Sequence, residues 1–271
     1  MSQAKSTLVL RLAAPLQSWG ERSQFNRRDT ANEPTKSGVL GLLAAAQGRA
    51  RQDDIDDLRD LDLGVRVDQP GTLLRDYHTV SDYRGRPLLA AAVNNKGMQK
   101  PTSPAKQTHV TKRYYLQDAV FVAAVSGPHE IIAALHDAVL RPAFPLALGR
   151  RACVPTQPIL LAPHGKALID GHSAMWQGDP LSVLRSVPWQ ASPEKLRQLQ
   201  RQPQRPAMVD LPVTVDAHDG DDVRVDLPTS FDPKKRSFTA RKVRHSWVSI
   251  PTPFDAADES DGHDPFALLG W

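Results

Sequence analysis

The stretch PTKSGVLGLLAAA at residues 34–46 constrains the fold more than any other part of the sequence. Every residue after Ser37 is apolar or glycine, so a helix formed here has to be buried, most simply against a sheet. Pro34 and the hydroxyl group of Thr35 mark its start, and Lys36 adds a charge at the positive end of the helix dipole. The pattern predicts a buried helix whose first turn can hold a phosphate. It is equally compatible with an ordinary capped core helix.

Several classes of protein are excluded by what the sequence lacks. No glycine stands directly before Lys36, so the stretch is not a nucleotide-hydrolysing P-loop. The one cysteine, Cys153, excludes an internal disulfide and a multi-cysteine metal site, and it suits a reducing cytoplasm. No apolar run approaches the roughly 20 residues that cross a bilayer. We therefore expect a cytoplasmic protein with no metal, no cofactor and no membrane partner.

Positive and negative side chains are segregated along the chain, although 34 Lys and Arg nearly balance 30 Asp and Glu. Residues 84–115 carry seven cations and no acid, residues 141–169 carry four cations and no acid, and residues 231–247 carry six cations and one acid. The acids gather at 53–62 and in the tail from 255 to 264. Segregation of this kind creates basic faces that attract phosphates. A set of solvated surfaces is the alternative interpretation of any single run.

Hydrophobic periodicity predicts strands at 7–13, 63–68, 72–80, 119–125 and 157–161, with helices at 34–46 and 129–140. This is the order of a ferredoxin-like or RNA-recognition-motif fold, interrupted by the basic segment that begins at residue 84. After residue 165 the chain is rich in proline, and short strands are expected at 208–215, 223–227 and 243–250. The tail after residue 254 has the composition of a disordered segment.

Four blocks of sequence then stand out in order. They are residues 10–20 (LRLAAPLQSWG), 34–44 (PTKSGVLGLLA), 74–80 (LRDYHTV) and 148–153 (LGRRAC). Together they resemble the CRISPR-associated Cas-five family, most closely its subtype E. The resemblance spans roughly the first 160 residues, and the remainder matches only loosely.

The resemblance implies an α+β protein with two parts and a tail. Residues 1–165 would form a ferredoxin-like (RRM-like) domain with a β-hairpin thumb inserted at about 81–114. Residues 166–254 would form a small, mostly β C-terminal part, and 255–271 an acidic tail.

The resemblance also implies a subunit of the type I-E Cascade complex that binds the 5′ handle of the CRISPR RNA (crRNA). Its partners would be the Cas-seven backbone subunit (CasC), the large subunit (CasA) and, through the complex, target DNA. Cutting of the precursor RNA would fall to a separate nuclease (CasE).

Binding of a single-stranded handle requires phosphate neutralisation, stacking surfaces and base-edge contacts. Arginine pairs suit bidentate phosphate contacts, and clusters that mix cations with rings suit single strands. The residues expected to contact RNA are Arg27, Arg28, Lys36, Ser37, Arg75, His78, Lys112, Arg113, Tyr114, Arg150 and Arg151. Arg22 would extend the basic surface that these residues form. For Tyr77 we favour a position in the core, and for Trp19 a position in the core or at an interface.

Two alternative functions stay open at this point. A metal-independent endoribonuclease that processes CRISPR repeat RNA would need a general base and a general acid, which His78 or His109 could supply with Lys112 and Tyr114. A scaffold that binds only protein is the third hypothesis. No carboxylate cluster has metal-ligand spacing, so no catalytic residue is assigned.

Overall fold

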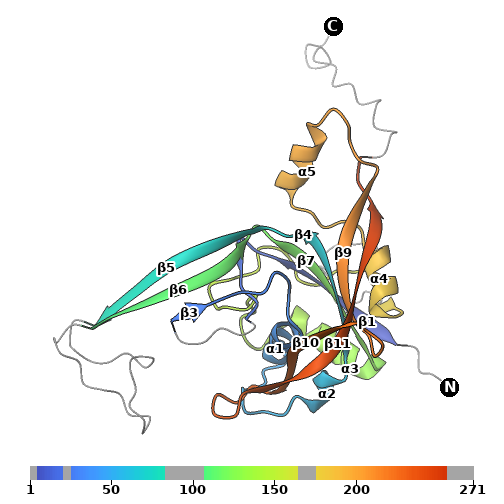
Figure 1. The fold of residues 1–271 in the computed structure, drawn as a ribbon. Coiled ribbons are helices and arrows are strands. Elements are labelled where there is room, and N and C mark those ends of the chain that lie inside the picture. The colour runs from blue at the N-terminus through green and yellow to red at the C-terminus, as the bar shows by residue number, and fades with distance from the viewer. Residues whose placement is uncertain (1–4, 21–25, 83–106, 164–174, 255–271) are drawn as a thin grey trace.

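The computed structural model describes residues 5–20, 26–82, 107–163 and 175–254, which form a body and a long hairpin that projects from it (Figure 1). The body is built on one seven-stranded sheet with the order β10-β11-β9-β4-β7-β1-β8. Every pair of neighbouring strands in this sheet is antiparallel. The strands are β1 (Ser6–Ala13), β4 (Asp62–Gln69), β7 (Val120–Gly127), β8 (Trp176–Gln177), β9 (Met208–Asp216), β10 (Asp222–Ser230) and β11 (Ser237–Pro251).

Helices cover both faces of this sheet. Helix α1 (Lys36–Ala46) and helix α3 (His129–Leu140) pack on one face with Leu10 and Phe121. Helix α4 (Pro180–Ser186) packs on the other face, where Val9 and Val122 point. Residues 9 and 10 face opposite ways because side chains alternate along a strand. The central strands β1 and β7 are therefore apolar on both faces, which accounts for their uninterrupted hydrophobic runs.

Helices α1 and α3 confirm the predictions at 34–46 and 129–140. Thr35 is the N-cap of α1 and accepts a hydrogen bond from the N–H of Gly38. The acidic stretch contains one short helix, α2 (Asp56–Arg59), with exposed carboxylates. Sequence analysis missed α4 and α5 (Pro193–Gln200). Both begin with a side-chain cap followed by proline, at Asp179 and Ser192, which is a recognisable start signal.

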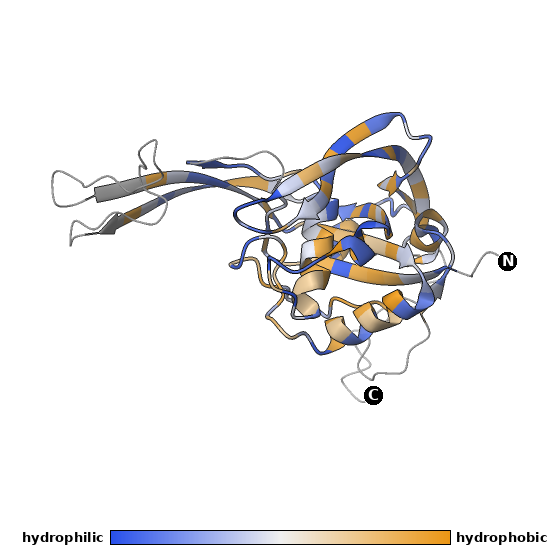
Figure 2. Ribbon diagram, turned by 90° about the horizontal axis from the view of Figure 1, so that it is seen from below, coloured by the Kyte–Doolittle hydropathy of each residue, from blue (hydrophilic) through white to orange (hydrophobic). Residues whose placement is uncertain are grey.

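A second, four-stranded sheet carries the projecting hairpin (Figures 1 and 2). Its long arms, β5 (Thr72–Asp82) and β6 (Gln107–Gln117), pair in register along their whole length. The other edge of β6 pairs with the short strands β2 (Leu16–Gln17) and β3 (Arg27–Arg28). The predicted thumb therefore has arms that begin nearer the body, at residues 72 and 117. The segment 83–106 lies outside the described residues.

Two expectations about topology need adjustment. The three C-terminal strands exist where predicted, but β9 pairs directly with β4, so they extend the N-terminal sheet. The division near residue 165 therefore does not separate two sheets. The predicted strand at 157–161 is reduced to an isolated bridge between Leu10 and Leu160. The two-residue β8 also pairs with β1 at this edge. The fold is α+β with mostly antiparallel sheets.

Candidate nucleic-acid interface

The register of the hairpin brings cations from distant parts of the chain together. Tyr77 on β5 pairs with Lys112 on β6, and Lys112 pairs with Arg27 on β3. Residues paired across neighbouring strands share a face of the sheet, so these three side chains form one row. Arg27 lies in the short strand β3, beside the base of the hairpin.

The face that carries this row combines cations with aromatic rings. Arg75 and Tyr114, which pair with each other, lie on it two residues from Tyr77 and Lys112. Arg27, Arg75 and Lys112 are exposed, and the side chain of Tyr77 is 63% exposed. The Arg27 guanidinium lies 5.1 Å from the centre of the Tyr114 ring. We call this set, which is Arg27, Arg75, Tyr77, Lys112 and Tyr114, the hairpin face.

One carboxylate lies at the edge of the hairpin face. Asp29 accepts hydrogen bonds from Nε of Arg27, at 2.9 and 3.1 Å. This hydrogen bond, together with the negative charge of Asp29, raises the pKa of Arg27. Sequence analysis did not single out Asp29, although its position two residues after Arg27 is a local signal. The cation at this edge is therefore balanced by a half-buried acid.

The opposite face of the hairpin carries the other predicted residues. Arg28 pairs with Arg113, and Arg113 pairs with Asp76. The Nε of Arg113 donates to the hydroxyl group of Thr111 at 3.2 Å. His78 lies on this side, with Nδ1 3.7 Å from a carboxylate oxygen of Asp76. This face therefore mixes two cations with an acid.

Arg150 connects β3 and β6, the two strands that carry most of the cations of the site. Its Nη1 donates to the backbone carbonyl of Tyr114 at 3.0 Å, and its Nη2 donates to the carbonyl of Arg28 at 2.7 Å. Its guanidinium lies 4.6 Å from the centre of the buried Tyr115 ring. Arg150 thus holds β3 against β6. Its neighbour Arg151 is exposed and has no ion pair within the described residues.

The glycine before Arg150 is required by the backbone that surrounds it. Gly149 has a φ of +92°, a conformation that L side chains rarely adopt. A Cβ atom there would lie 1.7 Å from the carbonyl oxygen of Ser18. The close approach of these two backbone segments places Arg150 under the hairpin.

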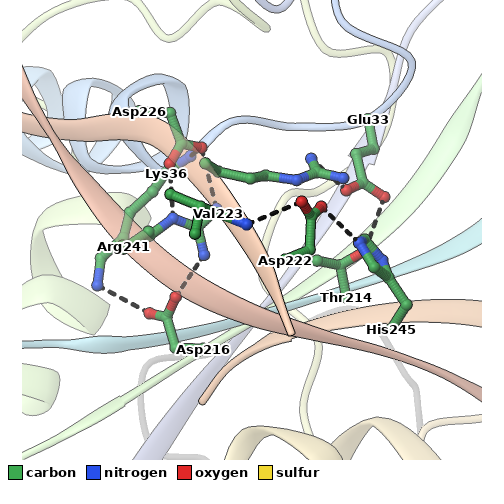
Figure 3. A network of polar contacts seen from close by, with 10 residues as sticks. Glu33, Lys36, Thr214, Asp216, Asp222, Val223, Asp226, Arg241 and His245 are labelled. Atoms are coloured by element: carbon green, nitrogen blue, oxygen red, sulfur yellow. Dashed lines mark hydrogen bonds and ion pairs between the residues drawn. The ribbon is translucent and has the colours of Figure 1, made fainter. Parts of the chain in front are cut away.

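Lys36 and Ser37 are both buried, and Lys36 lies in a cluster with Asp216, Asp226 and Arg241 (Figure 3). The backbone N–H of Lys36 donates to Asp226 at 2.8 Å, and its Nζ pairs with Asp216 at 2.8 Å. The anion at the start of α1 is therefore a carboxylate of the chain itself. This burial argues against the predicted phosphate contacts, because Lys36 is only 5% exposed and points to carboxylates of the chain itself, and Ser37 is only 8% exposed.

Arg241 completes this buried cluster of two cations and two acids. It forms two hydrogen bonds to Asp226, at 2.6 and 2.9 Å, and an ion pair with Asp216. Burial alone would raise the pKa of Asp226, but the hydrogen bonds and charge of Arg241 outweigh it and lower that pKa. The pKa of Arg241 is raised, because the two carboxylates outweigh the effect of burial.

The structure also tests two aromatic predictions. Trp19 is fully buried, as expected, and its ring lies against Gly38 of α1. The prediction that Tyr77 is in the core is wrong, because it is exposed on the projecting hairpin. Arg22 and the side chain of His109 lie outside the described residues.

Within the described residues, no group of three or more His, Cys, Asp or Glu side chains could hold a metal ion. No helix in the described part of the chain is long and apolar enough to span a membrane.

Comparisons with known proteins agree on one family. A family model described as CRISPR-associated protein (Cas_Cas5) matches residues 7–244. The CRISPR system Cascade subunit CasD of Escherichia coli (strain K12) is 38% identical over 172 residues, which cover 58% of this chain and 70% of that protein.

Two solved structures resemble this chain over most of its length. One belongs to a CRISPR RNA-guided surveillance complex, with a TM-score of 0.69 and 35% identity, and the match covers 91% of this chain and 92% of that chain. The other is described as the crystal structure of a Cas protein, with a TM-score of 0.59 and 34% identity. This second match covers 90% of this chain and 97% of that chain.

Proposed function

The chain belongs to the Cas5 family of CRISPR-associated proteins, and on that premise we propose that it is a non-catalytic subunit of a type I-E Cascade complex. In this role it binds the 5′ handle of the crRNA and helps to assemble the complex for antiviral DNA targeting. The Escherichia coli relative is a Cascade subunit, and one structural relative belongs to an RNA-guided complex.

The hairpin face carries this proposal. It offers three cations and two aromatic rings on one exposed surface. Cations neutralise the phosphates of a single strand, and rings stack on its unpaired bases. Arg28, Arg113 and His78 on the other side, with Arg151 nearby, would contact the strand where it passes the edge of the hairpin. Arg150 acts on the RNA indirectly, by fixing β3 and β6.

The same register argues against a nuclease. Side chains of His78 and Lys112 point to opposite faces, because His78 pairs with Thr111 and Tyr77 pairs with Lys112. Tyr114 shares the face of Lys112. A general base and a general acid must approach the same scissile phosphate, and His78 does not share a face with Lys112 or Tyr114. The proposed subunit therefore binds RNA that a separate nuclease has cut.

Protein partners follow from the proposed place in the complex. We assign contacts to the backbone subunit CasC and to the large subunit CasA. Leu73 on β5 is 63% exposed and Val80 is 38% exposed, which suits a hairpin that contacts a neighbouring protein. The strand order β8-β1-β7-β4, with α1 and α3 on one face, also supports a ferredoxin-like core.

Binding of handle RNA to the full chain tests the proposal. We expect the double variant Arg75→Ala, Lys112→Ala to bind the handle about tenfold or more weakly. Its salt slope should be shallower by about 1.4, since each phosphate contact to a single strand contributes about 0.7. The control Arg141→Ala, Arg185→Ala removes the same charge from exposed positions on the body. Equal affinity for the variant and the control would remove the hairpin face from the site.

The nuclease alternative is tested by mapping the 5′ ends of RNA that co-purifies with the chain. The chain is expressed with its operon neighbours and a repeat array, without the processing nuclease. We expect bound but uncut repeat RNA. A uniform 5′ end inside the repeat would mean that this chain cuts RNA.

A further inference from the structure

Helix α5 packs only loosely within the described part of the chain. It begins at the cap Ser192 and runs over Pro193–Gln200, and none of its eight residues is buried. Its apolar side chains, Leu196 and Leu199, remain partly exposed. In Figure 1 the helix stands away from the body, beside the ends of β9 and β11. A short amphipathic helix with little tertiary packing is marginal in water, so a further contact would stabilise it.

The helix and the loop after it are strongly basic. Lys195, Arg201 and Arg205 have no ion pair with any described residue, whereas Arg197 pairs with Glu194 at 2.6 Å. We call residues 193–205 the α5 wing. Three cations without an ion pair, beside two partly exposed leucines, fit a partner segment that is both acidic and apolar.

A pocket lies at the N-terminal end of the wing. Its volume is about 420 Å³, enough for a large aromatic side chain and its neighbours. Pro193, Lys195 and Gln198 of α5 contribute to one wall. Ala13, Ala14, Pro15, Ala119 and Val120 supply its apolar lining, and polar side chains, among them Asp118 and Glu194, supply the rest.

The chain itself carries a segment with the matching composition. Residues 255–264 contain five acids and no Lys or Arg, and residues 265–271 read PFALLGW. The segment starts beside the wing, because Thr252 is fixed to the chain that follows α5. The N–H of Thr252 donates to the carbonyl of Ala207 at 2.9 Å, and its hydroxyl group donates to the carbonyl of Pro206 at 2.6 Å.

We propose that the α5 wing is the docking surface for the chain's own residues 255–271. The acids of 255–264 pair with Arg205, Arg201 and Lys195, and the apolar end of the segment fills the pocket. The order of features supports this. Moving away from Thr252, the tail presents acids and then apolar residues, and the wing presents cations and then the pocket.

The lengths are compatible with this arrangement. Between Lys195 and Ala207 about half of the chain is helical and half is extended, so this stretch spans at most about 30 Å. Ten extended residues cover about 33 Å and seventeen cover about 56 Å. The acidic part of the tail therefore reaches every cation of the wing, and residues 265–271 reach beyond them. This contact goes beyond the proposed RNA binding and does not depend on it.

Hydrogen exchange of the α5 amides in the full chain tests the proposal. With the tail docked, we expect these amides to exchange about tenfold or more slowly than in Arg201→Glu, Arg205→Glu, which repels the tail. Adding Asp258→Arg and Asp261→Arg to that variant should restore slow exchange. The control Arg141→Glu, Arg185→Glu makes the same charge change elsewhere and should leave α5 unaffected.

Other results would overturn the proposal. If α5 exchanges equally fast in the wild-type chain and in the reversed variant, nothing covers the wing. If protection persists in Phe266→Asp, Trp271→Asp and rises with protein concentration, the wing binds a second copy. Loss of protection in the reversed variant without restoration by the charge swap would mean that the arginines act on the helix alone.

Discussion

At the scale of single residues, the contacts of Arg150 depend on the shape of its side chain. Its planar guanidinium reaches backbone carbonyls of β6 and of β3 while it lies on the Tyr115 ring. A lysine has a point charge on a flexible stem and cannot span two carbonyls in fixed directions. The alignment of the hairpin cations therefore depends on an arginine that need not touch RNA.

We expect Arg150→Ala to destabilise the protein by about 1–3 kcal/mol, because two charged hydrogen bonds to backbone carbonyls are lost. The affinity for handle RNA should also fall, and Arg150→Lys should not restore it. Urea unfolding and RNA binding measured on the same preparations check this. If Arg150→Lys restored full affinity, a phosphate contact would explain the residue better.

Lys36→Ala should act on stability alone. Removing the lysine leaves the partly buried Asp216 with Arg241 as its remaining cation, and the loss of one such charged contact costs about 1–3 kcal/mol. The RNA affinity of the folded fraction should be unchanged. Thermal unfolding together with RNA titration separates the two effects. A weaker affinity at an unchanged melting temperature would return Lys36 to the RNA site.

The lowered pKa of Asp226 predicts how the buried cluster responds to acid. A carboxyl group whose pKa is lower in the folded state stabilises the protein above its ordinary pKa, and this stabilisation is lost as pH falls through the folded value. Asp226→Asn should therefore be less stable than the wild type at pH 7, and the difference should shrink towards pH 3. Urea unfolding at several pH values measures it. A difference that grew on acidification would contradict the assignment.

The residue-scale prediction from sequence failed for Lys36 for a physical reason. Thr35, Lys36 and Gly38 look the same whether the helix start faces a phosphate or a carboxylate. The carboxylates that decide the matter, Asp216 and Asp226, lie 180 and 190 residues away along the chain. Local capping could be predicted, but the identity of the anion could not.

At the scale of elements, side chains alternate between the two faces of the hairpin, which places Tyr77 on the same face as Lys112. Tyr77→Ala should weaken binding of handle RNA by about 1–3 kcal/mol, which is typical of a lost base-stacking platform. Tyr77→Phe keeps the ring and should bind as the wild type does. Because Tyr77 is exposed, neither variant should change the melting temperature. Equal binding by Tyr77→Ala and the wild type would show that the ring does not stack on RNA.

Most elements were predictable because they combine a clear period with clear ends. The helix at 129–140 and the strands of the C-terminal part are examples. The pairing of Arg27 and Arg28 with β6 was not predictable, since a two-residue strand has no period. The prediction of a strand at 157–161 was wrong, because this segment forms only an isolated bridge, between Leu160 and Leu10.

At the scale of the whole molecule, the N- and C-terminal parts depend on each other. Strand β9 adds to the edge of β4, and Asp226 of β10 accepts from the start of α1. A fragment that ends at residue 165 should therefore fail to fold, although it contains the four family-like blocks. Circular dichroism and proteolysis of that fragment test this. A cooperatively folded fragment would support the division into two independent parts.

The joining of the two parts in one sheet could not be predicted from the sequence, because the periodicity of a strand does not specify which strand it pairs with. The family resemblance gave the body and the hairpin, but it covered the C-terminal strands only loosely. Arg66 illustrates the same limit. It is fully buried, pairs with Asp68 and donates to carbonyls at the end of α4, and nothing in its local sequence indicates that position.

The hydrogen bonds of Arg150 form a brace between β3 and β6, and this brace has a consequence for synthesis on the ribosome. It joins residues 122 positions apart, and β3 meets β6 across 85 positions. Contacts so distant in sequence form late, since the intervening chain must be ordered first. A nascent chain shorter than about 150 residues lacks the brace entirely. We therefore expect guide RNA to be captured only by chains whose translation is well advanced.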